Sequence, residues 1–193
     1  MENETRAQGF DRTATQALIA RLDLTPANRG IAETWLSLWR GNELPDRRFL
    51  NPADLKRNLS HLALFDVVPN VSVTVRLAGT SFAALLGMEL TGQDWIALAP
   101  EYRRAGRLRI FADIAAGALC VATRHVETGA TEVSLTEELL LPLAADPVYG
   151  AYPVLCHVDW KSARPDMKIK SPTQAIGTPD SFNITPLPGL VAA

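Results

Sequence analysis

The sequence contains few of the features that mark a secreted or membrane-spanning protein. It has only two cysteines among 193 residues, Cys120 and Cys156, and they are not spaced as a C-x-x-C pair. Such a pattern predicts free thiols in a reducing cytoplasm rather than a disulfide framework. No apolar run approaches the ~20 residues that a membrane span requires, and the polar, acidic start over residues 1–6 argues against a secretory signal. We therefore expect a cytoplasmic protein that does not insert into a membrane.

The usual marks of nucleic-acid binding and of catalysis are also missing. The formal net charge is −2, so no overall basic field attracts nucleic acid. The dinucleotide-binding pattern G-x-G-x-x-G, the P-loop, the zinc-protease pattern H-E-x-x-H and the hydrolase pattern G-x-S-x-G do not occur. We expect that the chain is not an enzyme, and we assign it no catalytic residue and no metal site.

The composition is that of an ordinary globular protein, with 47% hydrophobic and 21% charged residues. A domain of ~150 residues buries roughly 70% of the surface of its unfolded chain, which is enough for a core of its own. We predict an N-terminal extension over residues 1–25, polar and frayed up to residue 13, and one domain over residues 26–160. The tail over residues 161–193 holds five of the 13 prolines and few large apolar side chains, so it is predicted to be mostly disordered.

Two long helices are expected in the domain. Thr25-Pro26 offers a capping hydroxyl followed by a proline, and Gly41 ends the helix. The apolar residues between them share one face: Ile31, Trp35, Leu38 and Trp39. The second helix covers residues 101–116, with an apolar stripe on one side. Its arginines are interpreted as a solvated face, with binding of an acidic partner or a nucleotide as the alternative: Arg103, Arg104, Arg107 and Arg109.

Five strands are predicted. Residues 62–68 and 71–78 form an antiparallel hairpin broken at Pro69-Asn70, and the second of them alternates apolar and polar residues. Residues 119–126, 133–143 and 152–158 supply the other three. The fold class is therefore α+β, with a five-stranded antiparallel sheet, flanking helices and an N-terminal helix. Ligands favour concave places between helices and a sheet of this kind.

Short motifs follow one another in a specific order along this pattern. They are the tryptophan helix with its proline-marked loop (Trp35, Trp39, Arg40, Gly41, Pro45), a first strand (Leu64, Asp66, Val67), a second strand end (Arg76, Leu77, Gly79, Thr80) and a Leu-Thr-Gly step (Leu90, Thr91, Gly92). The ordered set resembles the PAS-like domain family of short alphaproteobacterial proteins, the PAS_5 type, over roughly residues 31–158. The loop Asp46-Arg47-Arg48-Phe49 departs from the family pattern, in which an acidic residue is expected before the Asn51-Pro52 step, and the tail is not covered by the resemblance.

The resemblance implies a sensory or interaction module that holds a small ligand between sheet and helices or binds a signalling partner protein. With no kinase, cyclase or DNA-binding module in the sequence, its output would pass through a partner or through rearrangement of a homodimer. A ligand could act only by preferring one of two such states. The alternatives are a ligand-free interaction adaptor and, less favoured, a small cone-fold enzyme, whose polar pocket the candidates below are too few to supply.

Three residues are candidates for ligand binding: Arg76, Asp66 and His61. Arg76 lies in an otherwise apolar alternation and needs a partner, for which Asp66 on the adjacent strand is the obvious candidate. Such a pair could fix the hairpin or bind an anion. No cofactor is identified, because the long helix has no histidine for haem and residues 80–100 have no cysteine for flavin photochemistry. Trp35 and Trp39 either fill the core or form a dimer interface.

Overall fold

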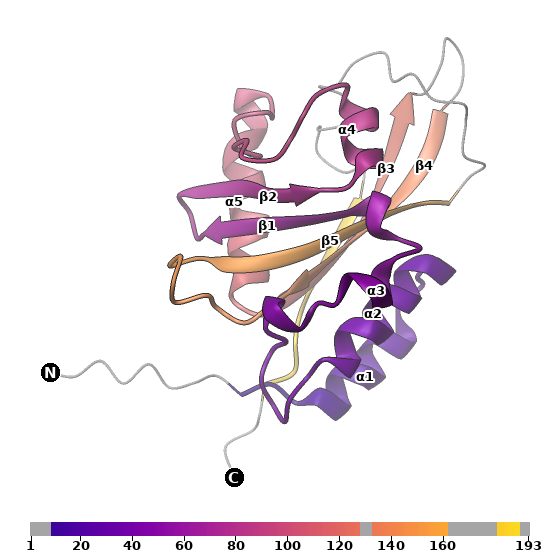
Figure 1. Ribbon diagram of the computed structural model, residues 1–193, viewed down its shortest axis with the longest axis vertical. Coiled ribbons are helices and arrows are strands. Elements are labelled where there is room, and N and C mark those ends of the chain that lie inside the picture. The colour runs from indigo at the N-terminus through magenta and orange to yellow at the C-terminus, as the bar shows by residue number, and fades with distance from the viewer. Residues whose placement is uncertain (1–8, 128–132, 162–180, 190–193) are drawn as a thin grey trace, which may run out of the picture.

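The computed structural model describes residues 9–127, 133–161 and 181–189. These residues form one antiparallel sheet with helices on both faces (Figure 1). The helices are α1 (Arg12–Arg21), α2 (Pro26–Ser37), α3 (Pro52–Leu55), α4 (Thr80–Leu86) and α5 (Glu101–Ala115), with short 3-10 turns η1 (Arg47–Phe49) and η2 (Leu59–His61). The strands are β1 (Leu62–Val68), β2 (Ser72–Ala78), β3 (Ala118–Glu127), β4 (Val133–Pro142), β5 (Tyr152–Trp160) and β6 (Ser181–Pro186).

The sheet has six strands in the order β2-β1-β5-β4-β3-β6. The predicted hairpin is confirmed: β1 and β2 pair antiparallel, and the turn between them contains Asn70 in the left-handed region at φ 60°. The α+β class, the flanking helices and the N-terminal helix are confirmed as well. The insert with α4 and α5 carries the chain from β2, at one edge of the sheet, to β3 on the other half. Strands β4 and β5 then follow in order back toward β1, and β5 pairs with β1 in the middle of the sheet.

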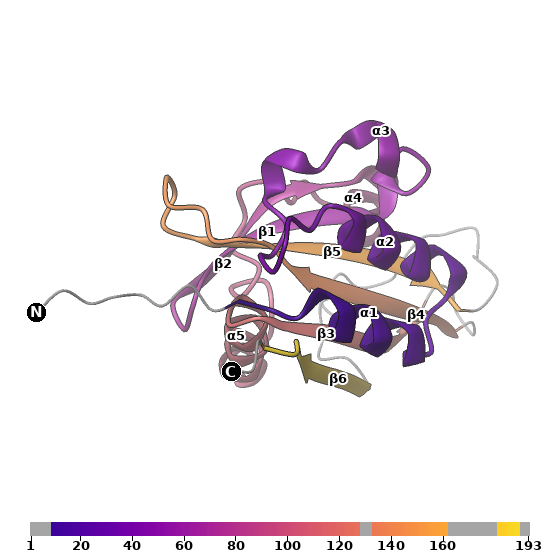
Figure 2. The ribbon, with the colours of Figure 1, turned by 90° about the horizontal axis from the view of Figure 1, so that it is seen from below.

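The strand count differs from the prediction because the tail contributes β6. Its backbone pairs with β3, with Cys120 opposite Ile184, and so covers what would otherwise be an exposed sheet edge (Figure 2). The prediction of disorder is therefore wrong for Ser181–Pro186. The rest of the predicted tail, residues 162–180 and 190–193, lies outside the described residues.

The expected fraying of the first residues is also wrong from Gly9 onward, while residues 1–8 lie outside the described part. The carboxylate of Asp11 caps α1 by accepting a hydrogen bond from the Ala14 amide at 2.9 Å. The Asp11 amide donates to the carbonyl of Pro188 at 2.7 Å, so the first and last described segments lie side by side. Phe10 packs against Gly117, whose φ of 97° and lack of a Cβ make room for the ring.

Each face of the sheet has its own core. On one face, α1, α2 and α3 cover an apolar cluster that includes Ile31, Leu139 and Leu141; on the other, α4 and α5 cover a cluster that includes Phe65, Phe111 and Leu140 (Figure 1). Successive residues of β4 point to opposite faces, as the pleat requires. Among the described residues, no helix is long and apolar enough to cross a membrane.

Trp35 of α2 and Trp39, two residues after the end of α2, fill the first of these cores. Trp35 is 0% exposed, donates from its indole nitrogen to the carbonyl of Pro142 at 2.9 Å, and meets Trp39 edge to face with ring centroids 5.1 Å apart. Two interpretations of these tryptophans were open, core packing and a dimer interface. The structure supports core packing, because both side chains lie in the core of a single chain. Neither side chain is exposed to a second copy, which corrects the interface hypothesis for Trp35 and Trp39.

Candidate functional site

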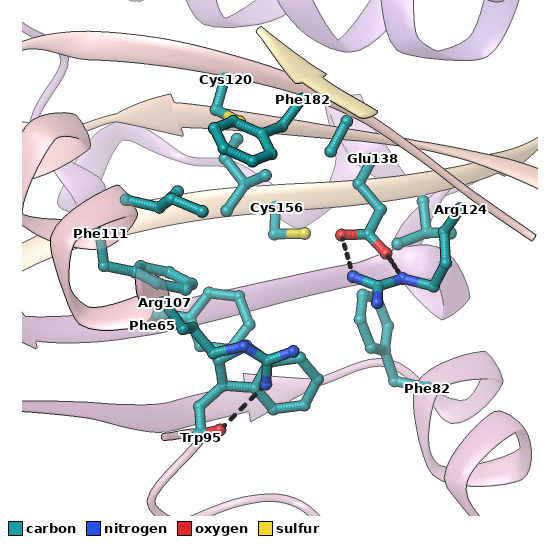
Figure 3. Close-up of a pocket in the computed structure, with 14 residues that line it drawn as sticks. Phe65, Phe82, Trp95, Arg107, Phe111, Cys120, Arg124, Glu138, Cys156 and Phe182 are labelled. Atoms are coloured by element: carbon teal, nitrogen blue, oxygen red, sulfur yellow. Dashed lines mark hydrogen bonds and ion pairs between the residues drawn. The ribbon is translucent and has the colours of Figure 1, made fainter. Parts of the chain in front are cut away.

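A cavity of about 60 Å³ lies between α5 and the inner face of the sheet (Figure 3). Side chains from β1, α4, α5, β3, β4, β5 and β6 and from the loop before α5 surround it. Its lining consists of Phe65, Phe82, Trp95, Arg107, Ile110, Phe111, Cys120, Ala122, Arg124, Glu138, Leu140, Cys156, Val158 and Phe182. Most of these side chains are apolar, and five of them are aromatic.

The aromatic side of the cavity is built around Phe65. Its ring lies 5.3 Å from that of Trp95 and 5.2 Å from that of Phe111, centroid to centroid, and the second contact is edge to face. Phe182, which belongs to β6, is 49% exposed. It therefore borders both the cavity and solvent, so that the tail strand contributes to the outer wall of the site.

A buried ion pair occupies the sheet side of the cavity. Nε of Arg124 lies 2.7 Å from one carboxylate oxygen of Glu138, and Nη2 lies 3.2 Å from the other, which is the two-pronged geometry of a strong guanidinium–carboxylate pair. The Arg124 residue is 5% exposed. Strand alternation places Arg124 on the same face as Ala122 and Cys120, two and four residues before it, so the pair points into the cavity (Figure 3).

A second guanidinium enters from the helix side. Arg107 of α5 is buried, donates to the carbonyl of Trp95 at 3.3 Å, and lies with its guanidinium carbon 5.2 Å from the centroid of the Trp95 ring. Burial, followed by the nearby positive charge of Arg124, lowers the pKa of Arg107 to about 10. Because this value is still well above neutral pH, Arg107 remains protonated there.

The interpretation of the α5 arginines as a solvated face is wrong for Arg107, which is buried, while Arg104 and Arg109 are exposed as expected. Phe111 and Ile114 follow Arg107 at i+4 and i+7, so all three belong to the helix face that covers the sheet. Arg104, by contrast, hydrogen-bonds the carbonyls of Ala97 and Ala99 outside the cavity. The helical spacing of Arg107, Phe111 and Ile114 therefore indicated that Arg107 faces the core. The prediction followed its charge instead and assigned it to solvent.

The two thiols are part of the cavity wall and have low reactivity. Cys120 and Cys156 are both free, as predicted, and both are buried. They both pair with Leu140 of the intervening strand, so they lie on strands that are not neighbours. Burial raises the pKa of Cys120 to about 12 and also raises that of Cys156 well above the ordinary value. Both thiols are thus protonated at neutral pH and poor nucleophiles.

None of the three residues proposed from sequence as ligand contacts lines this cavity. Asp66 pairs with Arg47, 3.0 Å away, and Arg47 also pairs with Asp146 at 2.8 Å. Arg76 is exposed, with its guanidinium carbon 5.2 Å from the ring centroid of Tyr149. The expected Asp66–Arg76 pair is therefore wrong, because Arg47 from the preceding loop is the partner of Asp66.

His61 lies at the end of η2, also away from the cavity. Its Nδ1 is 3.0 Å from the hydroxyl of Ser60, and its ring lies 6.2 Å from that of His157, centroid to centroid. The residues that do bring charge into the cavity, Arg107, Arg124 and Glu138, were missed by sequence reasoning. For Arg124 and Glu138 the missed signal was the period of two along their strands.

A separate polar network fixes α2 to the opposite face of the sheet. The carboxylate of Glu137, 0% exposed, accepts hydrogen bonds from the side-chain amide of Asn28 and the backbone amide of Thr25, both at 2.8 Å. Its other oxygen lies 2.8 Å from the ammonium group of Lys161. Burial acts to raise the pKa of Glu137, but the hydrogen bonds from Lys161, Asn28 and Thr25 outweigh it, so the pKa is lowered.

Comparison with known families agrees with this architecture. The model of a family described as a PAS domain, PAS_5, matches residues 24–151, which is most of the chain and includes α2, β1 to β4 and the helices between them. A comparison with curated proteins finds no match.

Proposed function

The chain belongs to the PAS domain family, and on that basis we propose that it is a sensory or regulatory module that binds a small ligand in the cavity between α5 and the sheet. PAS domains are in general sensory or signalling modules. The observation that carries the proposal for this chain is the cavity itself, in which three charged side chains face an otherwise apolar, aromatic space.

A purely structural core has no need of such groups. Desolvating a guanidinium and a carboxylate costs several kcal/mol for each ion, and packing the same space with apolar side chains is often as stable or more so. The sequence nevertheless places Arg107, Arg124 and Glu138 around one cavity on three different elements. A small number of placed polar groups in a mostly apolar concave site is the usual composition of a ligand pocket.

The position of the cavity would allow a bound molecule to change the arrangement of elements that also reach the protein surface. Its lining includes Trp95 in the loop before α5, Arg107 on α5 and Phe182 on β6. A ligand that fits one arrangement of these elements better than another shifts the population toward that arrangement. We propose that this shift is passed to a signalling protein partner or to the second copy in a homodimer.

Catalysis is not part of the proposal. Within the described lining, the ionisable groups are two protonated arginines, the Glu138 carboxylate held at both oxygens by Arg124, and two thiols with raised pKa values. None of them is placed to exchange a proton with a substrate near neutral pH. We propose a role in the cytoplasm, where the two unlinked thiols would stay reduced.

The alternative function is a ligand-free adaptor, and one observation favours it. Several large apolar side chains are exposed at the end of the sheet formed by the β1–β2 turn and the β4–β5 loop, among them Val71 at 70% and Val148 at 82%. Tyr152 beside them pairs with Val67 across β5 and β1. Exposed apolar groups of this kind are common at surfaces that bind proteins.

The two functions differ in whether a ligand changes association. We suggest measuring self-association by analytical ultracentrifugation for the protein as purified and for the same protein stripped of small molecules by unfolding and refolding. Ligand sensing predicts different association constants, together with altered amide exchange in α5 and β6. Equal constants and equal exchange in the two preparations would favour the adaptor.

A further inference from the structure

We propose that the chain forms a homodimer in which strand β6 of one copy pairs antiparallel with β6 of a second copy, so that the two sheets join into one. The strand lies outside residues 24–151, the part of the chain that the family model matches, so family membership does not supply this surface. The inference deepens the proposed function and rests on it in one respect, because it names the surface through which a ligand would change association.

The sheet has two edges, β2 and β6, and the edge at β2 is already covered. The amide of Val75 donates to the carbonyl of Gln93 at 2.9 Å, and the amide of Trp95 donates to the carbonyl of Val73 at 2.8 Å. Arg76 adds an exposed charge to the same strand. Backbone groups that are bonded within the chain are not available to a further strand, and an edge charge discourages pairing. The β2 edge is therefore a poor docking edge.

The outer side of β6 directs backbone groups away from the rest of the sheet. The strand pairs with β3 in a continuous antiparallel register, and Leu187, directly after it, donates its amide to the carbonyl of Gly117 at 2.9 Å. In such a ladder, hydrogen-bonded pairs alternate with pairs whose backbone groups point away. Because Leu187 makes a bonded pair, every second residue before it does too, and Phe182 and Ile184 lie between these and point outward. Among the described residues, no strand pairs with this side (Figure 2).

This outer edge also lacks the usual protection against pairing. Exposed edge strands commonly carry a charge, an internal proline or a bulge. The sequence of β6 is Ser-Phe-Asn-Ile-Thr-Pro, which is uncharged and has its one proline at the end, and its register with β3 shows no bulge. Phe182 is also 49% exposed and offers a large apolar surface that a neighbouring strand would cover. These features favour a paired edge over a solvated one.

The partner that fits this edge is a second copy of the same strand. A two-fold axis places a strand antiparallel to itself, so each contact is made twice. With the axis at Asn183, Phe182 of one copy lies opposite Ile184 of the partner, and both outward amides of each strand meet a carbonyl. The two side chains form an aromatic–β-branched cross-strand pair on one face, a type of pair that stabilises sheets. Because the strand is uncharged, no like charges of β6 face each other.

Phe182 links this edge to the cavity. It lines the cavity, and Ile184 packs against the same core on that face of the sheet. Figure 3 shows the Phe182 ring beside Cys120 at the wall of the cavity. A ligand that shifts Phe182 would therefore act on the strand whose backbone makes the dimer. The interface and the proposed ligand site thus share one residue.

The experiment places charges at the proposed axis. Asn183 is exposed and would lie opposite its counterpart, so Asn183→Lys brings two like charges together and should weaken dimerisation about 10-fold. Gln93→Lys adds the same charge at an exposed position beside β2 and should have no effect. A mixture of Asn183→Lys and Asn183→Glu chains brings opposite charges together and should recover the affinity of the unaltered chain. Analytical ultracentrifugation of the full chain at a series of concentrations measures the dissociation constants.

Amide hydrogen exchange tests the register independently. In the dimer the amides of Phe182 and Ile184 become hydrogen-bonded, so raising the protein concentration should slow their exchange about 10-fold or more. The Leu187 amide is bonded within one chain, so its exchange should depend much less on concentration. Its protection in Asn183→Lys also verifies that β6 remains paired with β3 in the variant. If that protection is lost, the exchange of the unaltered chain still decides the question.

The outcomes separate this inference from the proposed function. A chain that stays monomeric, or a dimer that Asn183→Lys does not weaken, would overturn the β6 interface and leave ligand binding in the cavity in place. Exchange of Phe182 and Ile184 that is slow at every concentration would mean that another part of the chain covers the edge, and it would overturn the interface as well. A β6 dimer with the same association constant before and after small molecules are removed would support the interface and count against ligand sensing.

Discussion

Asn28 and His157 are 129 positions apart in the sequence, yet the side-chain oxygen of Asn28 lies 2.6 Å from Nδ1 of His157. The amide group of Asn28 is oriented by its donation to Glu137 at 2.8 Å, so its oxygen is the atom that faces the histidine. Nδ1 of His157 must therefore carry the proton and donate it. This contact, with the Glu137 network beside it, fixes α2 to the face of the sheet opposite the cavity.

The buried histidine predicts a specific dependence of stability on pH. Burial is the main cause that lowers the pKa of His157 to about 4, from an ordinary value of 6.5; His61 acts in the same direction, while Asp159 and Glu137 oppose it. Below pH 6.5 the unfolded chain binds a proton that the folded chain does not, so the free energy of unfolding falls as the pH decreases to about 4. The largest possible loss is about 3 kcal/mol.

This prediction can be measured by urea unfolding at pH 7, 5.5 and 4.5. His157→Gln keeps a donor for Asn28 but does not titrate, so its stability should change less over this range. His125→Gln, at an exposed position, should behave as the unaltered protein does. If His157→Gln and the unaltered protein lose stability equally, the buried histidine is not the cause. The lowered pKa of Glu137 adds a further loss at lower pH.

The ion pair in the cavity predicts strong coupling between Arg124 and Glu138. Removing one partner leaves the other charge buried, so Arg124→Met alone or Glu138→Leu alone should each cost about 3 kcal/mol of unfolding free energy. The double variant removes both charges, and it should cost less than the sum by about 2 kcal/mol. Denaturant titration of the four proteins measures this difference directly. Additive effects would show that the pair contributes no interaction of its own.

Phe182 is predicted to control access to the cavity. Because the two thiols belong to the wall, their rate of reaction with a small disulfide reagent reports entry without any knowledge of the ligand. Phe182→Ala should speed labelling of Cys120 several-fold under native conditions. Phe49→Ala is a matched control, since Phe49 is also partly exposed and contacts Arg40 away from the cavity. Equal labelling rates in the unaltered protein and in both variants would mean that the reagent does not enter the cavity past Phe182.

The burial of Trp35 predicts a cost in stability without a change in assembly. Trp35→Phe keeps an aromatic ring but removes the indole donor to the buried Pro142 carbonyl, which should cost about 2 kcal/mol. Denaturant unfolding measures this loss, and ultracentrifugation measures self-association. An altered association constant in a variant that remains folded would restore the interface role that the structure argues against.

The sequence predicted those parts of the fold in which local pattern and burial agree. The capped helix with Ile31 and Trp35 on one face, the hairpin broken at Pro69-Asn70 and the long helix after Pro100 all appear close to their expected positions. The strand β6 was missed. Its sequence Ser-Phe-Asn-Ile-Thr-Pro does alternate polar and apolar residues, but the stretch is only six residues long and lies in a proline-rich tail. Its place in the sheet depends on backbone hydrogen bonds to β3, which a sequence pattern does not record.

The candidate site was predicted less well, for a related reason. Asp66 and Arg76 were expected to pair because they lie on adjacent strands, whereas Arg47 reaches Asp66 from a loop whose path is set by tertiary contacts. Arg107 occupies a core-facing helix position, but a charged residue in such a pattern is normally assigned to solvent. Charged side chains inside a core are exceptions to the rule that charged residues face solvent. Because burying them is costly, their presence there is informative about function.

The most direct test of the central claim, that the cavity holds a ligand, is native mass spectrometry of freshly purified protein compared with its denatured mass. Ala122 lines the cavity, and Ala122→Leu fills part of it; Ala32→Val adds volume to the opposite core as a control. The account predicts a non-covalent mass on the unaltered protein and on Ala32→Val that is lost in Ala122→Leu. A bare mass for the unaltered protein, or a bound mass that Ala122→Leu retains, would contradict it.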